Sequence, residues 1–386
     1  MTTTAGVMNA LAPQIVDHQI MGAVTAIVSA NTRSSAAPIT IQLECIGHAA
    51  QDRPMAVDTV FRIASMSKPI TGAAVLMLQD EGRLQLSDTV TKYIPELGAL
   101  RTPAGDQASV TLLQMLTHTS GMGEGDLPVG ASSLAELVPA WSAADMLFAP
   151  GERWSYCQSG INACCRVVEV VSGLPFDEFL QQRLFGPLGM VDTTFYPSAE
   201  QLTRLAAMYT RTEAGKLETA PEPSSAARGD KTPPLGNGGL FSTAPDYARF
   251  ARMLLGGGRV DGVTYLSSGA VAQMSQPATP LDMPCGFMPG FGLNYGWGAG
   301  CCVLKKSHPG PGESILPGTF GHGGAWGTQC WIDPAAGAAY LLFVQRNNFG
   351  ASTSDRPGLR QQNADNTPAR ADFQAAAAKT VRLSNL

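Results

Sequence analysis

The sequence has little charge, and the charges that it has are balanced. Only 15% of the 386 residues are charged, and 26 Lys and Arg stand against 31 Asp and Glu, for a formal net charge of −5. No basic block interrupts this balance, so we expect no nucleic-acid partner. Together with 44% apolar residues, the low charge also excludes a coiled coil, an extended helical array and a disordered chain.

Long apolar runs are absent as well. The longer runs, such as Ala338–Val344, are far short of the roughly 20 residues that cross a bilayer. The first residues, Met1–Thr4, lack the basic residues and the apolar run of a signal peptide. We therefore expect no membrane partner and a cytoplasmic location.

Cysteines with the spacing of a zinc site are also missing. Two adjacent pairs, Cys164-Cys165 and Cys301-Cys302, match no disulfide scaffold, so we predict reduced thiols. Structural zinc usually uses Cys pairs two to four residues apart, which argues against a metal. The candidate cluster for a metal site spans about 46 residues and comprises Cys285, Cys301, Cys302, His308 and Cys330. Whether its cysteines form disulfides stays open. No phosphate-loop Lys accompanies a Gly-rich run, so we expect no cofactor.

What the sequence does contain is an abundance of turn-forming residues, 42 Gly and 27 Pro, around segments with clear periodicity. Two hairpins are predicted, one from residues 23–28 and 39–43 and one from residues 329–333 and 338–345. Apolar residues at helical spacing predict helices over Ser65–Gln79, Thr111–Thr117, Ser142–Phe148, Ile161–Val171, Phe176–Phe185, Thr243–Leu255 and Ala371–Val381.

The order of these elements predicts an α+β fold. Strands at both ends of the chain, with helices between them, indicate one antiparallel sheet built from both termini and flanked by helices, into which a mainly helical domain is inserted. We place the sheet domain at residues 1–83 plus 206–386 and the helical domain at residues 84–205, with the active site in the cleft between them.

The first chemical motif is Ser65-Met66-Ser67-Lys68. If Ser65 begins a helix, Lys68 lies one turn later on the same face, beside the serine hydroxyl. A Lys in a partly desolvated cleft can take the proton of a serine and so make it a nucleophile. The structural alternative is a Ser that caps the helix and a solvated Lys.

Two further segments carry candidate groups. In the loop Pro150–Gly160, Tyr156 could share a proton with Lys68, and Gln158 could hold a substrate carbonyl; alternatively they are a packed aromatic and a capping amide. In Phe320–Gly327 four glycines let a substrate approach the backbone closely, although a lone His in such a run is more often structural.

The order and spacing of five segments resemble the serine β-lactamase-related enzymes, the group of class C β-lactamases, DD-peptidases and family VIII carboxylesterases. The resemblance covers nearly the whole chain and implies the β-lactamase-like fold. It also implies that Ser65 is the acylated nucleophile and that Lys68 and Tyr156 exchange its proton. The oxyanion hole would be the backbone N–H groups of Ser65 and Ala325. The five segments are Phe61–Thr71, Thr111–Gly121, Pro150–Tyr156, Leu184–Met190 and Gly238–Thr243.

Two departures from the family pattern bear on the substrate. The pattern Tyr-x-Asn is Tyr156-Cys157-Gln158 here, and Lys-Thr-Gly is replaced by His322-Gly323-Gly324. A Lys binds an anionic group well, whereas a neutral His does so poorly. These positions are therefore predicted to bind a neutral substrate.

Two aromatic residues complete the predicted substrate site. Trp326, and with less support Phe241, are predicted to line the substrate cleft, the alternative being that both rings fill the core.

The function predicted from these features is a serine hydrolase that cleaves carboxylic esters of small neutral substrates through an acyl-enzyme on Ser65. The alternatives are an amidase or peptidase acting on a small peptide or amide oligomer, or a weak β-lactamase with the same machinery. A catalytically silent binding protein of this fold is a third reading. The chain has no Gly-x-Ser-x-Gly elbow, so an α/β-hydrolase would lack its nucleophile.

Overall fold

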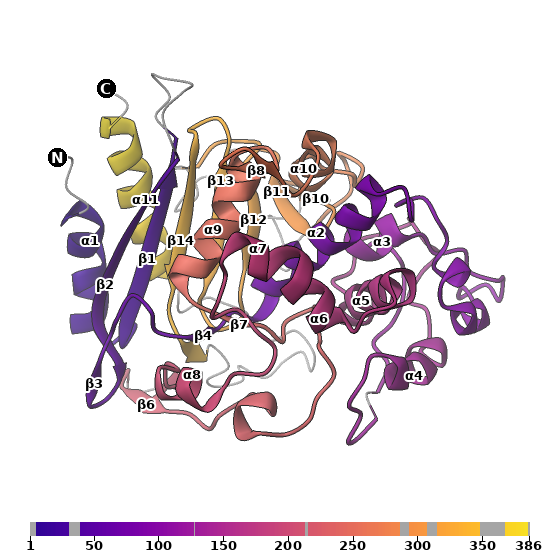
Figure 1. The fold of residues 1–386 in the computed structure, drawn as a ribbon, viewed down its shortest axis with the longest axis horizontal. Helices are drawn as coiled ribbons and strands as arrows, with labels where there is room; N and C mark the ends of the chain where they lie inside the picture. The colour runs from indigo at the N-terminus through magenta and orange to yellow at the C-terminus, as the bar shows by residue number, and fades with distance from the viewer. Residues whose placement is uncertain are drawn as a thin grey trace.

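The largest β-sheet is built from both ends of the chain (Figure 1). The computed structural model describes residues 5–30, 39–126, 128–212, 215–285, 293–306, 315–347 and 367–384. Neighbouring strands of this sheet are antiparallel, and β1 lies beside β14, as predicted. The strand order is β10 (Tyr295–Gly298), β11 (Cys301–Leu304), β12 (Phe320–Gly323), β13 (Gln329–Asp333), β14 (Ala338–Phe343), β1 (Gly22–Ser29), β2 (Thr40–Ala50) and β3 (Arg53–Pro54).

The central strands are apolar along their length because both faces of the sheet are covered. Val24 of β1 packs in the core that includes α9 (Ala244–Leu255). Ile27 of the same strand packs in a second core with α1 (Ala5–Val16) and α11 (Thr367–Ser384). Successive side chains of a strand point to opposite faces, so a strand between two cores needs apolar residues at every position.

The helices of the middle of the chain gather beside the sheet, on the right of Figure 1. They are α3 (Leu112–Leu116), α4 (Val138–Ser142), α5 (Gln158–Ser172) and α6 (Phe176–Leu180). Helix α2 (Ser67–Asp80) contacts α5 on one side and β11 and β12 on the other, and its residues from Ser67 to Leu78 are all buried. The predicted domain boundaries stay a prediction, but α2 carries the Ser-x-x-Lys motif to where sheet and helices meet.

Most predicted elements are confirmed, with two corrections. Helix α2 begins at Ser67 and not at Ser65, because a 3₁₀ turn over Ala64–Met66 precedes it. The predicted helix over residues 142–148 is wrong, since Met146 instead forms a β-bridge with Met122 and the Leu147 N–H donates to the Gly121 carbonyl. Tertiary pairing overrides the local helical pattern there.

The sequence patterns also miss several elements. Helix α1 was not predicted, and the Gly- and Pro-rich stretch before Leu316 contains β10, β11 and α10 (Ser268–Ser275). Gly300, with a φ of +74°, lies in the tight turn between β10 and β11. A strand pair with glycines in and between its strands has little of the β-branched signature that marks a hairpin in sequence.

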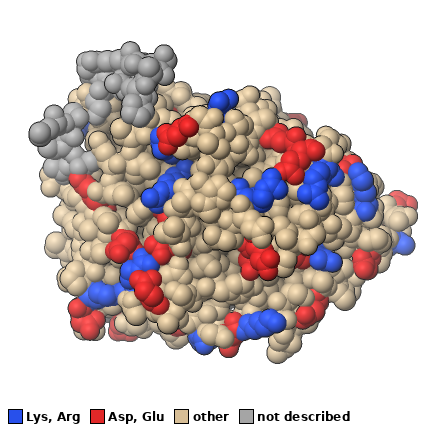
Figure 2. Space-filling view, in the orientation of Figure 1, with Lys and Arg blue, Asp and Glu red and all other residues tan. Residues whose placement is uncertain are grey.

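In the described part of the chain no helix is both long and apolar enough to cross a membrane. Acidic and basic side chains are interspersed on the face seen in Figure 2, most of which is uncharged.

The remaining short strands and helices of the described residues are β4 (Phe61–Arg62), β5 (Tyr209–Arg211), β6 (Leu217–Thr219), β7 (Phe241–Ser242), β8 (Arg259–Val260), β9 (Val263–Thr264), β15 (Arg346–Asn347), α7 (Gly186–Leu188) and α8 (Ala199–Thr203).

Candidate active site

Ser65 is presented by a strained turn at the start of α2. The residue before it, Ala64, has a φ of +46°, in the left-handed region that non-glycine residues rarely adopt. Two hydrogen bonds hold this conformation: Ser67 Oγ donates to the Ala64 carbonyl at 2.7 Å, and Tyr247 Oη donates to the Met66 carbonyl at 2.7 Å. The turn leaves the Ser65 side chain partly exposed, so its hydroxyl is accessible to a substrate.

The structure brings Lys68 and Tyr156 to the hydroxyl of Ser65. Lys68 Nζ lies 3.1 Å from Ser65 Oγ, and Tyr156 Oη lies 2.9 Å from the same atom. Tyr156 comes from the loop that precedes α5, 91 residues away in sequence. Both distances are within reach for proton transfer. The Ser-x-x-Lys spacing predicts the Lys68 contact, and the family resemblance implies the Tyr156 contact.

Burial drives Lys68 toward its neutral form. The side chain has no solvent exposure, and this desolvation lowers the pKa of Lys68 to about 7, although the charge of Glu124 raises it in part. Nζ also donates to the Asn237 carbonyl at 2.6 Å. A neutral Lys68 has a lone pair free to accept the Ser65 proton.

Tyr156 stays protonated over the same pH range. Burial raises the pKa of its phenol well above the usual value, and the hydrogen bond to Ser65 opposes this shift only in part. Opposite shifts in two adjacent groups separate their roles. These shifts suit Lys68 to accept a proton and Tyr156 to donate a hydrogen bond.

His322 contacts Tyr156 on the side of β12. Its Nδ1 lies 2.7 Å from the Gly323 carbonyl, and its Nε2 lies 3.3 Å from Tyr156 Oη. A carbonyl only accepts, so Nδ1 carries the proton, and the unprotonated Nε2 faces the phenol, whose one proton is donated to Ser65 Oγ. Burial, with the nearby Lys68 charge, lowers the pKa of His322 to about 3, so this position presents no positive charge at neutral pH.

Aromatic rings and one carboxylate fix the position of Tyr156. The ring of His118 lies 4.4 Å from that of Tyr156 and 4.7 Å from that of Trp297. His118 Nδ1 accepts the N–H of Cys157 at 3.1 Å. Glu124 accepts from the backbone N–H groups of the first two residues of α5, where a carboxylate is favoured by the free N–H groups and the helix dipole.

Asn237 forms hydrogen bonds with residues of both α2 and α5 at the site. Besides its carbonyl contact with Lys68, its Nδ2 donates to Gln158 Oε1 at 2.9 Å, and its N–H donates to Asn162 Oδ1 at 3.1 Å. Gln158 therefore lies at the site, as predicted, with its amide oxygen engaged by Asn237. The amide NH₂ of Gln158 is the end left for a substrate carbonyl.

The glycine turn after His322 is held directly against the nucleophile segment. A Cβ at Gly324 would lie 2.5 Å from the Ile63 carbonyl and 2.1 Å from Thr328 Oγ1, so only glycine fits. Thr328 Oγ1 donates to the Ile63 carbonyl at 3.2 Å, and Arg370 of α11 donates to the Gly324 carbonyl at 2.9 Å. These contacts fix the backbone next to Ala325, whose N–H is the predicted partner of the Ser65 N–H in the oxyanion hole.

Comparison with known proteins agrees with this arrangement. The family model described as Beta-lactamase matches residues 8–364. The chain belongs to the beta-lactamase family.

This family of serine hydrolases includes both esterases and penicillin-binding proteins. The chain is 32% identical to penicillin-binding protein 4 of Amycolatopsis lactamdurans over 77% of this chain and 74% of that one. It is 29% identical to esterase EstB of Burkholderia gladioli, over 78% of this chain and 81% of that one. The solved structure of EstCE1, a hydrolase with promiscuous acyltransferase activity, superposes with a TM-score of 0.79 at 21% identity, over 97% of this chain and 98% of that one, which supports the β-lactamase fold.

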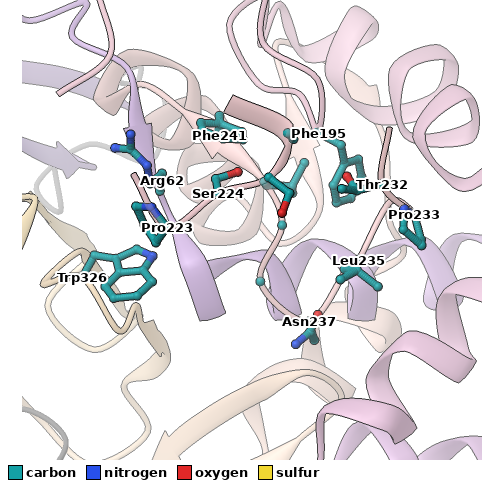
Figure 3. A pocket seen from close by; sticks show the side chains of 15 residues that line it. Arg62, Phe195, Pro223, Ser224, Thr232, Pro233, Leu235, Asn237, Phe241 and Trp326 are labelled. Atoms are coloured by element: carbon teal, nitrogen blue, oxygen red, sulfur yellow. The ribbon is translucent and has the colours of Figure 1, made fainter. Parts of the chain in front are cut away.

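The two predicted aromatic residues lie at a pocket beside the site (Figure 3). Trp326 and Phe241 are both among its lining residues. Trp326 is partly exposed and follows Ala325 directly, whereas Phe241 is only 1% exposed. Phe241 therefore contributes mainly to the core, and Trp326 is the better placed of the two to meet a substrate.

The described residues contain no cluster of three or more His, Cys, Asp or Glu side chains that could hold a metal ion. His308, a member of the cysteine cluster considered above, lies outside the described residues. The eight cysteines are free thiols. Cys301 and Cys330 are buried among apolar side chains, where burial raises the pKa of both thiols and keeps them unreactive.

Four residues of this beta-lactamase-family site were not predicted from the sequence. His118 lies within the Thr111–Gly121 segment that carries the family resemblance, so that motif was the available signal. Asn237 immediately precedes the Gly238–Thr243 segment and could have been found in the same way. Glu124 and Trp297 stand in segments with no distinctive spacing, and only the folded chain brings them to Tyr156. The four residues are His118, Glu124, Asn237 and Trp297.

The lowered pKa of Lys68 predicts the pH dependence of the enzyme. Since Lys68 must be neutral to accept the Ser65 proton, kcat/KM for a neutral ester should rise as the pH passes through about 7 and then level off. In Glu124→Gln the negative charge that raises this pKa is absent, so the midpoint should move to lower pH. Initial rates from pH 5 to 10 measure both profiles. A wild-type midpoint near 10, or no shift in the variant, would contradict the assignment of Lys68 as the buried base.

Proposed function

We propose that this protein is a carboxylesterase that hydrolyses small neutral esters through an acyl-enzyme on Ser65. The observation that carries the proposal is the pair of contacts at Ser65 Oγ, 3.1 Å from Lys68 Nζ and 2.9 Å from Tyr156 Oη. A weak nucleophile next to a neutral amine and a protonated phenol is suited to acyl transfer.

In the first step the bond from Ser65 Oγ to the ester carbon forms while the Ser65 proton moves to Lys68 Nζ. The negative charge on the carbonyl oxygen is stabilised by the N–H groups of Ser65 and Ala325. The bond to the alcohol oxygen then breaks, and this oxygen takes a proton from the Lys68 and Tyr156 pair. Water next attacks the acyl carbon and gives a proton to the Lys68 and Tyr156 pair. The bond between the acyl carbon and Ser65 Oγ then breaks, Oγ takes the proton back, and the acid is released.

The charges around the site favour an uncharged substrate. His322 is neutral because burial lowers its pKa to about 3, so it offers no cation where β-lactamases carry a Lys. The Arg62 guanidinium is paired with Glu222, and the exposed carboxylate of Glu124 at the start of α5 repels an anion. The name of esterase EstB, one of the relatives, agrees with ester hydrolysis.

One observation favours a second candidate, a peptidase or amidase that recognises a carboxylate. Arg370 of α11 reaches the turn at Gly324, and a Cβ at Gly323 would lie 3.9 Å from its guanidinium nitrogens. A guanidinium beside the predicted oxyanion hole can hold the terminal carboxylate of a peptide. The likeness to a penicillin-binding protein agrees with this reading.

A substrate panel decides between the two candidates. We expect p-nitrophenyl butyrate to have a higher kcat/KM than nitrocefin or a D-alanyl dipeptide. Because Arg370 also holds the Gly324 carbonyl beside the predicted oxyanion hole, Arg370→Gln should lower the rates with all substrates, and it should lower those with carboxylate-bearing substrates the most. If wild type prefers the anionic substrates, the second candidate replaces the first.

Introducing a cation at position 322 should alter selectivity. His322→Lys is expected to improve binding of the anionic nitrocefin by roughly 1–3 kcal/mol, the range of a hydrogen bond to a charged group. His322→Gln, which also removes the imidazole but adds no charge, is the matched control. Parallel kinetics with nitrocefin and p-nitrophenyl butyrate measure the effect. Equal gains in both variants would show that loss of the imidazole, and not the new charge, is responsible.

A further inference from the structure

A pocket of about 330 Å³ opens beside the catalytic turn (Figure 3). Trp326 and Pro223 form one side of it, and Leu235 and Asn237 form the opposite side. Its volume is in the range of small-ligand pockets. The walls come from the Gly-rich turn after β12 and from the segment 223–241, which is far from that turn in sequence.

The pocket lies one residue away from the reacting groups: Ser65, Lys68 and Tyr156 do not line it, but two of its lining residues contact Lys68 or the residue before Ser65. Asn237, one of its lining residues, is the residue whose carbonyl binds Lys68 Nζ. Gly238, also in the lining, packs against the backbone of Ala64, the neighbour of the nucleophile. Trp326 is next to Ala325 of the proposed oxyanion hole. When the carbonyl oxygen of an ester lies in that hole, one of the two groups on the carbonyl carbon, the acyl chain or the alcohol, can therefore reach this pocket.

That substituent is the acyl chain and not the alcohol. In the mechanism proposed above, Tyr156 is the hydrogen-bond donor of the pair, so we take its phenol as the group that passes the proton to the alcohol oxygen and lies within hydrogen-bond distance of it. Tyr156 is enclosed by the rings of His118, Trp154, Trp297 and His322. None of these rings is among the residues that line the pocket, so the leaving group and the pocket lie on different sides of the scissile bond.

The chemistry of the lining fits an uncharged chain. Its one cationic side chain, Arg62, is 5% exposed, donates through Nε to Glu222 at 2.6 Å and donates to the Ala206 carbonyl at 2.8 Å. The guanidinium is thus neutralised and saturated within the wall. Apolar side chains such as Leu235 and Phe195, with the ring of Trp326, make up most of the remaining surface.

We infer that this pocket receives the acyl chain of a short or medium aliphatic ester, and that the absence of a side chain at position 238 keeps it open. The inference rests on the esterase function proposed above. The three atoms nearest to a Cβ at Gly238 would be backbone atoms of Ala64, at 3.6–3.8 Å, which is ordinary contact, and the φ of Gly238 is outside the left-handed region. A side chain is therefore compatible with the backbone there but occupies pocket volume.

The test is a graded series, Gly238→Ala and Gly238→Val, assayed with p-nitrophenyl acetate, butyrate and octanoate. We expect the octanoate-to-acetate ratio of kcat/KM to fall progressively, by at least about tenfold in Gly238→Val, while acetate hydrolysis changes little. Gly269→Val is the matched control, because a Cβ at this exposed glycine of α10 also meets its nearest atom at 3.6 Å. It should leave all three rates unchanged.

A second arm varies the alcohol of acetate esters at constant acyl group. The inference is wrong if the Gly238 variants change the preference among alcohols, or if they lower the rates for all chain lengths equally. Acetate hydrolysis by the variants shows that they are folded. If wild type cleaves none of these esters, the proposed esterase function itself is contradicted, and this result is distinct from an altered alcohol preference.

Discussion

Ser65→Ala should lower kcat for a neutral ester by a factor of about a million, the typical loss when a serine nucleophile is removed. The side chain is partly exposed at the start of α2, and its hydroxyl serves mainly as the meeting point of Lys68 and Tyr156. The fold should therefore persist, with a melting temperature within a few degrees of wild type. Rates with p-nitrophenyl butyrate and thermal unfolding measure the two effects.

A suitable control changes a serine that is not at the reacting atoms. Ser275→Ala alters a hydroxyl at the end of α10 that only donates to the Ala272 carbonyl, and it should keep wild-type activity. If Ser65→Ala retained more than about a thousandth of the wild-type kcat, an acyl-enzyme on this residue would be untenable.

Lys68→Met should have the next largest effect. It removes the base, so we expect kcat/KM to fall by about a hundredfold to ten-thousandfold, and the rise in activity near pH 7 should disappear from what remains. Lys68 is fully buried and shifted toward its neutral form. An apolar side chain of similar length should therefore be accepted without unfolding.

The comparison for this variant is Lys92→Met, which removes an exposed lysine that pairs with Asp88. Surface pairs of this kind contribute little, so both activity and pH profile should match wild type. A Lys68→Met enzyme that kept the pH 7 transition would show that another group, and not Lys68, titrates in the rate profile.

The sequence was sufficient to predict that Lys68 lies beside the Ser65 hydroxyl, because this contact is determined by local spacing. Lys68 follows Ser65 by one helical turn, and the distance of 3.1 Å results from that spacing. The two hairpins in the middle of the sheet, β13–β14 and β1–β2, were predicted for a similar reason, since the continuous apolar runs of their central strands reflect two buried faces. The role of Tyr156 depended on the family resemblance, because nothing local joins it to Ser65.

Other parts of the site depend on tertiary contacts that no local pattern encodes. The pairing of Arg62 with Glu222 joins residues 160 apart in sequence, and Asn237 meets Lys68 across 169 residues. The strained φ of Ala64 could not be predicted from the sequence, because alanine has no preference for the left-handed region. The wrong helix at residues 142–148 has the same origin, since its residues pair with Gly121 and Met122 instead.

The measurement that tests the central claim most directly is the mass of the enzyme quenched during turnover of p-nitrophenyl butyrate. We expect a fraction of wild type to gain one butyryl group, and peptide mapping to place it on Ser65. Ser65→Ala should carry no adduct. A phosphonate directed at active-site serines should label the same residue and block turnover. Labelling of any other residue, or turnover that continues after Ser65 is blocked, would contradict the proposal, and a chain that neither hydrolyses the ester nor takes the phosphonate would be a binding protein of this fold.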